Sequence, residues 1–71
     1  MTTFKLRETD EFIKMGQVIK AVGFVESGVD AKDVILQGLV TYNGEVCTMR
    51  GKKCYPGDQI GFEGQTVTIE R

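Results

Sequence analysis

The chain has 71 residues, of which 41% are hydrophobic and 27% charged, and a formal net charge of -1 at pH 7. A domain of this size buries only about 60% of the surface that its unfolded chain exposes, which predicts a thin core and argues against a large internal cavity. The composition is too apolar for intrinsic disorder, no apolar run approaches the ~20 residues that cross a bilayer, and the start lacks a signal-peptide pattern, so we expect a single cytoplasmic domain, residues 1–71.

The chain begins with an alternation of apolar and charged side chains over residues 4–7, which predicts a short, half-buried edge strand. Residues 10–23 then carry apolar side chains at i, i+3, i+4 and i+7, the spacing of one helix face: Met15, Val18, Ile19 and Val22. Gly23, which has no side chain, is predicted to end this first helix as its C-terminal cap.

A second helix is predicted to begin after Ser27. Ser27 and Asp30 stand three residues apart and resemble a capping box, with Asp in place of the usual Glu or Gln. This helix stops at Gly38, and its apolar face consists of Ala31, Val34 and Ile35. Because only a few residues join the two helices, they must pack as a compact hairpin or corner.

The second half of the chain has the pattern of short strands and tight turns. Asn43-Gly44 lies between two β-rich runs and indicates a hairpin, because a type I′ turn needs positive φ at both central residues. Pro56-Gly57 suits a type II turn, and a last pair of strands surrounds Glu63-Gly64. The order predicts an α+β domain with the two helices packed as a corner against a small, mostly antiparallel sheet of about four to five short strands.

One stretch of this second half, residues 49–58, concentrates positive charge, and we call it the basic connector. It holds three of the nine Lys and Arg residues and has no acid before its last position: Arg50, Lys52 and Lys53. A solvated bend would explain this clustering as well as a binding site would. The clustering alone therefore does not decide between them.

Cys47 and Cys54 are the chain's two cysteines, and it has no histidine. Two cysteines cannot build the disulfide framework of a small secreted domain, and their spacing is not that of metal ligands, so we expect no metal and no other cofactor. Without histidine the commonest general base is missing, which makes a thiol-dependent enzyme the weakest functional class. We expect Cys54 to be a buried apolar residue and Cys47 to be an exposed, inert thiol.

Several residues stand at the positions and spacing of a known motif: Ser27, Ala31-Lys32, Val34-Ile35, Gly38, Val40, Asn43-Gly44 and Pro56-Gly57-Asp58. This series resembles the alpha-L RNA-binding motif, the domain named after small-subunit ribosomal protein four. The resemblance covers about residues 13–63. Residues 11–23 and 50–58 particularly resemble the short stand-alone bacterial members of that family.

In that family the two helices and the hairpin after them form an L-shaped surface against the backbone of structured RNA. The resemblance implies the same for this chain, with these residues on that surface: Lys14, Ser27, Lys32, Gln37, Arg50, Lys52 and Lys53. Physical chemistry supports this choice, because the first N–H groups of a helix attract phosphate and an Arg side chain can fork onto it. We expect the cations of both helices and of the basic connector to form one positive surface beside Ser27.

Three acids depart from the family pattern at positions where many relatives carry arginines or other basic residues: Glu26, Asp30 and Asp33. They weaken the local positive field and are compatible with weaker RNA binding, a narrower footprint on the RNA, or a surface that has shifted toward a protein partner. Tyr42 and Tyr55 could stack on a splayed base, although strand and turn tyrosines more often pack against the protein. The sequence predicts a non-catalytic module for structured RNA of the ribosomal or transfer RNA class, with a protein-interaction adaptor on the same fold as the alternative.

Overall fold

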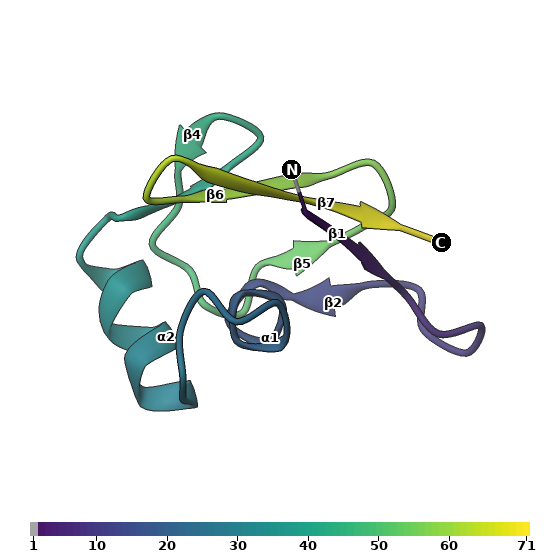
Figure 1. The fold of residues 1–71 in the computed structure, drawn as a ribbon, viewed down its shortest axis with the longest axis horizontal. Coiled ribbons are helices and arrows are strands. Elements are labelled where there is room, and N and C mark those ends of the chain that lie inside the picture. The colour runs from purple at the N-terminus through teal and green to yellow at the C-terminus, as the bar shows by residue number, and fades with distance from the viewer. Residues whose placement is uncertain (1) are drawn as a thin grey trace.

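The computed structural model describes residues 2–71, which form two helices and seven strands (Figure 1). The helices are α1 (Met15–Ala21) and α2 (Gly28–Leu36). The strands are β1 (Thr2–Lys5), β2 (Ile13–Lys14), β3 (Val40–Tyr42), β4 (Glu45–Val46), β5 (Lys53–Cys54), β6 (Gln59–Phe62) and β7 (Gln65–Glu70). Five strands form one sheet in the order β1-β7-β6-β3-β4, and β2 and β5 form a second, two-stranded sheet.

Both helices lie on the same side of the larger sheet, where they pack against each other (Figure 1). This arrangement confirms the predicted α+β class with a mostly antiparallel sheet. Within residues 2–71, no helix has the length and apolar character needed to cross a membrane.

The ends of the helices follow local sequence signals. Ser27 precedes α2, and its Oγ accepts a hydrogen bond from the Asp30 N–H at 3.2 Å. Gly23 follows α1 with a φ of 83°, and Gly38 follows α2 with a φ of 77°, a left-handed conformation that favours glycine. The helix α1 is shorter than the predicted segment because its first expected turn is replaced by β2.

The tight turns also have the predicted geometry. In the two hairpin turns both central residues have positive φ, as a type I′ turn requires: Asn43 (51°), Gly44 (89°), Glu63 (50°) and Gly64 (77°). At Pro56-Gly57 the Tyr55 carbonyl accepts the Asp58 N–H at 3.0 Å, and Gly57 has a φ of 96°. The predicted hairpins and the type II turn are therefore confirmed.

Two strand pairings were not predicted. β1 is an edge strand, as expected, but it begins earlier than predicted and pairs in parallel with β7 at the far end of the chain. The basic connector contains β5, which pairs with β2 and places Ile13 opposite Cys54 and Lys14 opposite Lys53. The connector is thus held to the residues that precede α1 and does not project as a free bend.

The core lies between the helices and the larger sheet. Its buried side chains come from both layers: Leu6, Met15, Val18, Ile19, Ala31, Ile35, Val40, Cys54, Ile60, Phe62, Val67 and Ile69. The predicted burial of Cys54 is confirmed. Cys47 is half-buried and packs against the core, so the prediction that it is exposed was wrong. It lies just beyond the short strand β4, where strand alternation no longer sets which way a side chain points.

Candidate nucleic-acid interface

The basic connector is fixed to the start of α1 by backbone hydrogen bonds. The Met15 N–H donates to the Lys52 carbonyl at 2.9 Å, and the Gly16 N–H donates to the Arg50 carbonyl at 3.0 Å. These two N–H groups are among the four at a helix start that lack partners within the helix, so the connector satisfies them. Gly16 also allows the close approach, because a Cβ there would lie 3.5 Å from the Arg50 carbonyl oxygen.

A pocket of about 380 Å³ lies between α1, α2 and the connector. Four cations from separate segments line it: Lys14, Lys20, Lys32 and Arg50. Its other lining residues are neutral: Gly16, Gln17, Gly28, Ala31 and Gly51. We call it the basic pocket. Among the described residues no Asp or Glu lines it, so the positive field of its cations is not cancelled at the wall.

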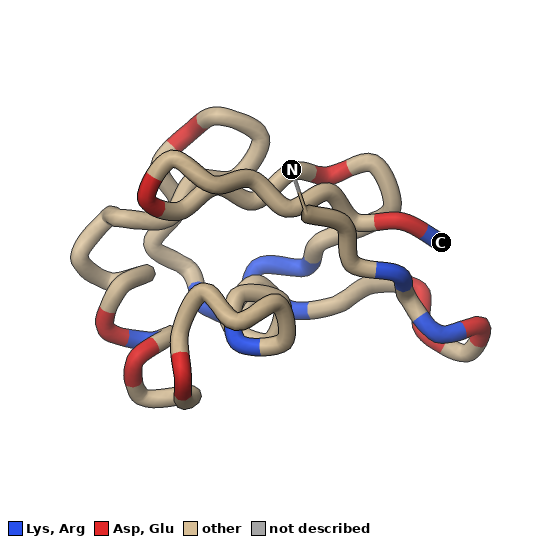
Figure 2. Tube along the Cα trace, viewed as in Figure 1, with Lys and Arg blue, Asp and Glu red and all other residues tan. Residues whose placement is uncertain are grey.

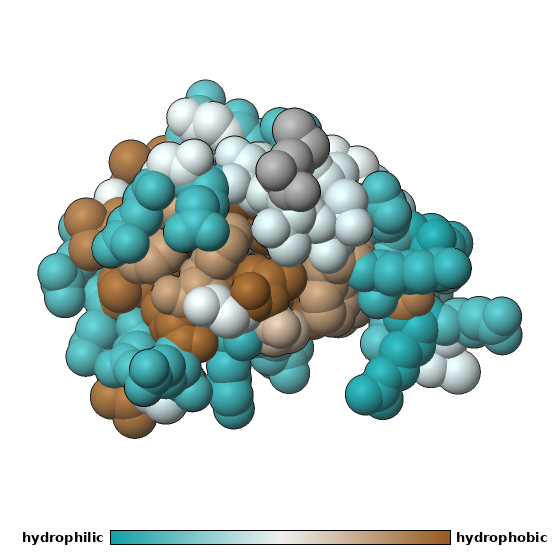
Figure 3. Space-filling model, viewed as in Figure 1, coloured by the Kyte–Doolittle hydropathy of each residue, from teal (hydrophilic) through white to brown (hydrophobic). Residues whose placement is uncertain are grey.

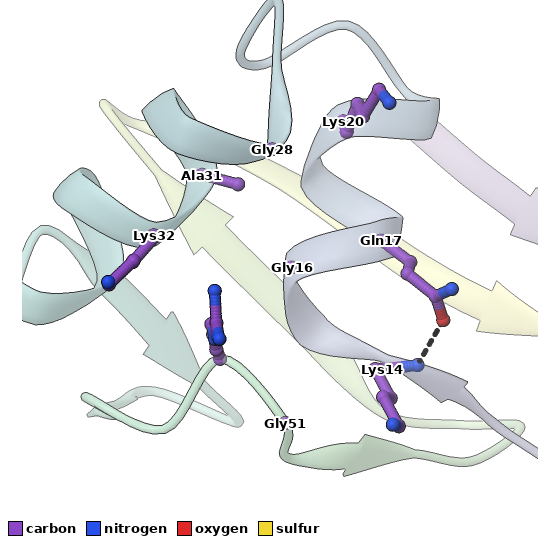
Figure 4. A pocket seen from close by; sticks show the side chains of 9 residues that line it. Lys14, Gly16, Gln17, Lys20, Gly28, Ala31, Lys32 and Gly51 are labelled. Carbon is purple, nitrogen blue, oxygen red and sulfur yellow. Dashed lines mark hydrogen bonds between the residues drawn. The ribbon is translucent and has the colours of Figure 1, made fainter.

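The positions of the labelled side chains show how the pocket is built (Figure 4). Lys32 extends from α2 and Lys14 from the end of β2, on opposite sides of the hollow. Gln17 turns back toward the strand, and its Oε1 accepts the Lys14 N–H at 3.4 Å. Gly28 and Gly51 also line the pocket, and a Cβ added at either would meet no atom within 4 Å.

The structure places only part of the predicted site at this pocket. Lys14, Lys32 and Arg50 meet there, although they come from three segments that are distant in sequence. Lys20 and Gln17 were not among the predicted site residues. A sequence signal for them existed, because Lys14, Gln17 and Lys20 follow one another at intervals of three and lie off the apolar stripe of α1.

Lys52 and Lys53 take other directions and do not line the basic pocket. The Lys52 Nζ lies 4.8 Å from the centre of the Tyr42 ring, and the Lys53 Nζ lies 5.0 Å from the centre of the Phe12 ring. Both are cation–π contacts. Lys53 stays near Lys14, its partner across the β2–β5 pair, and like charges in that position repel.

The two predicted polar residues of α2 occupy its two ends. Ser27 lies next to Gly28 of the basic pocket, but its Oγ is already engaged with the Asp30 N–H. Gln37 is the C-terminal cap and lies away from the pocket, at the other end of the helix. The α2 acids Asp30 and Asp33 are exposed and do not line the pocket.

Asp58 links the end of the connector to the first hairpin. Its carboxylate accepts hydrogen bonds from the Tyr42 hydroxyl, from the Asn43 side chain at 3.2 Å and from the Tyr55 N–H at 2.8 Å. Burial by itself would raise the pKa of Asp58, but these bonds and the charge of Lys52 outweigh it and lower that pKa below the usual value. The hydrogen bond from the Tyr42 hydroxyl to Asp58, together with burial, raises the pKa of Tyr42 to about 12.

Figure 2 shows where the charged residues lie along the fold. Positive positions without an acid between them follow β2, α1, β5 and the loop before β5. Positive and negative positions alternate on α2 and in the segment between β1 and β2, and further acids lie at the turns of the larger sheet (Figure 2). A chain with a net charge of -1 therefore still has a region in which cations predominate.

Comparison with known proteins gives a family match over nearly the whole chain. The model of the S4 domain matches residues 4–70. YbcJ of Escherichia coli K12 is 32% identical over 69 residues, which cover 97% of both chains. The Bacillus subtilis protein named "Probable ribosome maturation protein RlbA" is 37% identical over 54 residues, which cover 76% of both chains.

A solved structure agrees with this match. The solution structure of E. coli YbcJ superposes with a TM-score of 0.73 at 31% identity, and the match covers 100% of this chain and 89% of that one. That structure is described as revealing an alpha-L motif involved in RNA binding.

Proposed function

Because the chain belongs to the S4 domain family, a family with an alpha-L RNA-binding motif, we propose that it is a non-catalytic binder of structured RNA. In this proposal the basic pocket receives backbone phosphates. The RNA is of the ribosomal or transfer RNA class, and the ribosome maturation name of the B. subtilis relative favours ribosomal RNA. Lys14, Lys32 and Arg50 make the principal contacts, and Ser27 lies beside them at the start of α2. Lys52, Lys53 and Gln37 lie outside the basic pocket, where they could contact only more distant parts of the RNA.

The observation that carries the proposal is the meeting of four cations from separate segments around one hollow, with no acid among the described residues that line it. Bringing like charges together is unfavourable unless an anion is present, and RNA supplies a closely spaced row of phosphates. The Arg50 guanidinium can fork onto two phosphate oxygens, whereas Lys14, Lys20 and Lys32 act as point charges. Such contacts position an RNA without reading its sequence.

A protein-interaction adaptor is the second candidate, and the outer face of α2 favours it. Val29 and Leu36 are 70% and 57% exposed, and Asp33 lies on the same side of the helix between them. Hydrophobic side chains also gather over α2 and the segment that joins it to α1, with hydrophilic ones around them (Figure 3). An apolar face with acids beside it would suit a basic protein segment.

A paired set of variants tests the RNA proposal. The double variant Lys32→Gln, Arg50→Gln removes two charges from the basic pocket, and Lys5→Gln, Arg7→Gln removes the same two charge types outside it. Binding to purified ribosomal RNA and transfer RNA would be measured by fluorescence anisotropy over a range of salt concentrations. Each lost phosphate contact makes the plot of log affinity against log salt concentration less steep by about 0.7–0.9. The slope for the pocket variant should therefore be less steep than that of the parent by roughly 1.4–1.8, and the slope for the control variant should be nearly unchanged.

RNA binding by the parent protein distinguishes the RNA-binding function from the adaptor function. RNA binding that weakens steeply with salt, and that depends on the pocket charges, supports the RNA proposal. Binding to neither RNA, or equal losses in both double variants, would overturn it and leave the adaptor as the better candidate.

A further inference from the structure

A second cavity, of about 190 Å³, adjoins the first hairpin and the basic connector. Its lining residues are Tyr42, Glu45, Val46, Cys47, Met49 and Lys52, and we call it the Tyr42 cavity. The connector serves both hollows, because Met49 and Lys52 line this cavity while Arg50 and Gly51 line the basic pocket. Neighbouring residues of the connector thus line two different hollows.

The wall of the Tyr42 cavity combines the apolar side chains of Val46 and Met49 with the charged side chains of Glu45 and Lys52. Val46 and Met49 are 64% and 63% exposed, which is high for large hydrophobic side chains placed side by side at a cavity. Tyr42 is half-buried, and its hydroxyl is held by Asp58, so its ring has a fixed orientation before any ligand arrives. Lys52 lies over that ring, 4.8 Å from its centre.

The charges of the two hollows select different parts of a nucleotide. Among the described residues, the lining of the basic pocket has four cations and no acid, which suits a phosphate. The described lining of the Tyr42 cavity has one cation, Lys52, and one acid, Glu45, so it is formally neutral and suits an uncharged ring. Unpaired RNA bases stack on aromatic side chains, and Tyr42 supplies such a ring.

We infer that the Tyr42 cavity binds one unpaired RNA base while the basic pocket holds the adjoining backbone. A base inside a regular duplex is stacked on its neighbours and cannot enter, so the preferred RNA carries a bulged or looped-out nucleotide. This inference rests on the proposed function. It adds a ligand class, an unpaired nucleotide in structured RNA, that phosphate contacts alone do not specify.

The test compares a blunt duplex of two fully complementary RNA strands with the same duplex carrying one bulged 2-aminopurine. The parent should bind the bulged RNA more tightly and change the fluorescence of the bulged base as that base stacks. Tyr42→Leu should lower the affinity for the bulged RNA about tenfold, leave the paired RNA unaffected and leave the salt slope unchanged. Tyr42→Phe keeps the ring and should retain most of the preference.

Exposed positions provide variants that do not threaten the fold. Met49→Ala should weaken binding of the bulged RNA several-fold, whereas Leu36→Ala, a truncation at an exposed site outside both hollows, should not. Equal affinity of the parent for both RNAs, or bulge binding that is unchanged in both Tyr42→Leu and Met49→Ala, would overturn the inference alone. Failure to bind either RNA would overturn the proposed function with it, so the two failures are distinct.

Discussion

Asp58 illustrates how a single side chain joins segments that are far apart in the sequence. Its carboxylate connects the Tyr42 and Asn43 side chains of the first hairpin with the Tyr55 backbone before the Pro-Gly turn. The Asn43 side chain also accepts the Gln59 N–H at 2.8 Å, so the network continues into β6. The sequence identified Asp58 as part of the family motif, but no local pattern predicted which groups it would bind.

The lowered pKa of Asp58 predicts a specific loss of stability in acid. A carboxyl whose pKa is lower in the folded than in the unfolded state stabilises the fold above its unfolded pKa, near 3.9, and this contribution disappears as pH falls through the folded value. We expect Asp58→Asn to lower the free energy of unfolding by roughly 1–2 kcal/mol at pH 7. Urea unfolding of parent and variant between pH 7 and pH 2.5 would show the gap narrowing below about pH 4, and a constant gap would contradict the assignment.

The two cysteines should react at different rates in the native protein. Burial raises the pKa of Cys54 to about 12, so at neutral pH its thiol is both inaccessible and protonated. Iodoacetamide at pH 8 should modify the half-buried Cys47 first, and mass spectrometry of native and urea-unfolded samples would compare the two sites. Equal rates in the native sample would show that β5 opens readily.

Among the helices, strands and turns, the sequence predicted those features that depend on residues close together in the chain. The helix ends at Gly23 and Gly38 and the turn at Asn43-Gly44 follow from residues within a few positions of each other. The β1–β7 and β2–β5 pairings join distant segments, and β2 and β5 have two residues each, too few for a periodic pattern to appear. The sequence also predicted the cluster of cations in the connector. It did not predict that Lys52 and Lys53 would turn toward aromatic rings, because Tyr42 and Phe12 lie on segments distant in the sequence.

One glycine of the sheet provides a test of this packing. A Cβ at Gly61 of β6 would overlap the Thr41 Oγ1 on the neighbouring strand β3. Gly61→Ala should therefore destabilise the protein by about 1–3 kcal/mol, measured by thermal or urea unfolding. Gly28→Ala is the control, since a Cβ there meets nothing within 4 Å. Adding Thr41→Ala should recover part of the loss, and a purely additive double variant would contradict the proposed clash.

At the scale of the whole molecule, the fold gathers scattered charges into separate regions. Lys14 and Lys32 are eighteen positions apart, and Arg50 follows eighteen positions later, yet all three line one pocket. The acids lie at the sheet turns, on α2 and in the loop between β1 and β2 (Figure 2). Net charge and composition could not predict this separation, because it arises from the β2–β5 pair and from the packing of α1 against α2.

RNA binding at the basic pocket can be mapped by following the amide resonances of isotope-labelled protein as ribosomal RNA fragments are added. The largest changes should fall on residues 14–20, 28–32 and 50–52, which surround the basic pocket, and they should diminish with added salt. Amides of residues 2–8 and 63–66 should change little. Changes centred on the β6–β7 turn or around Val29, Asp33 and Leu36 on the outer side of α2, with the other pocket amides unmoved, would show that RNA does not bind at the basic pocket.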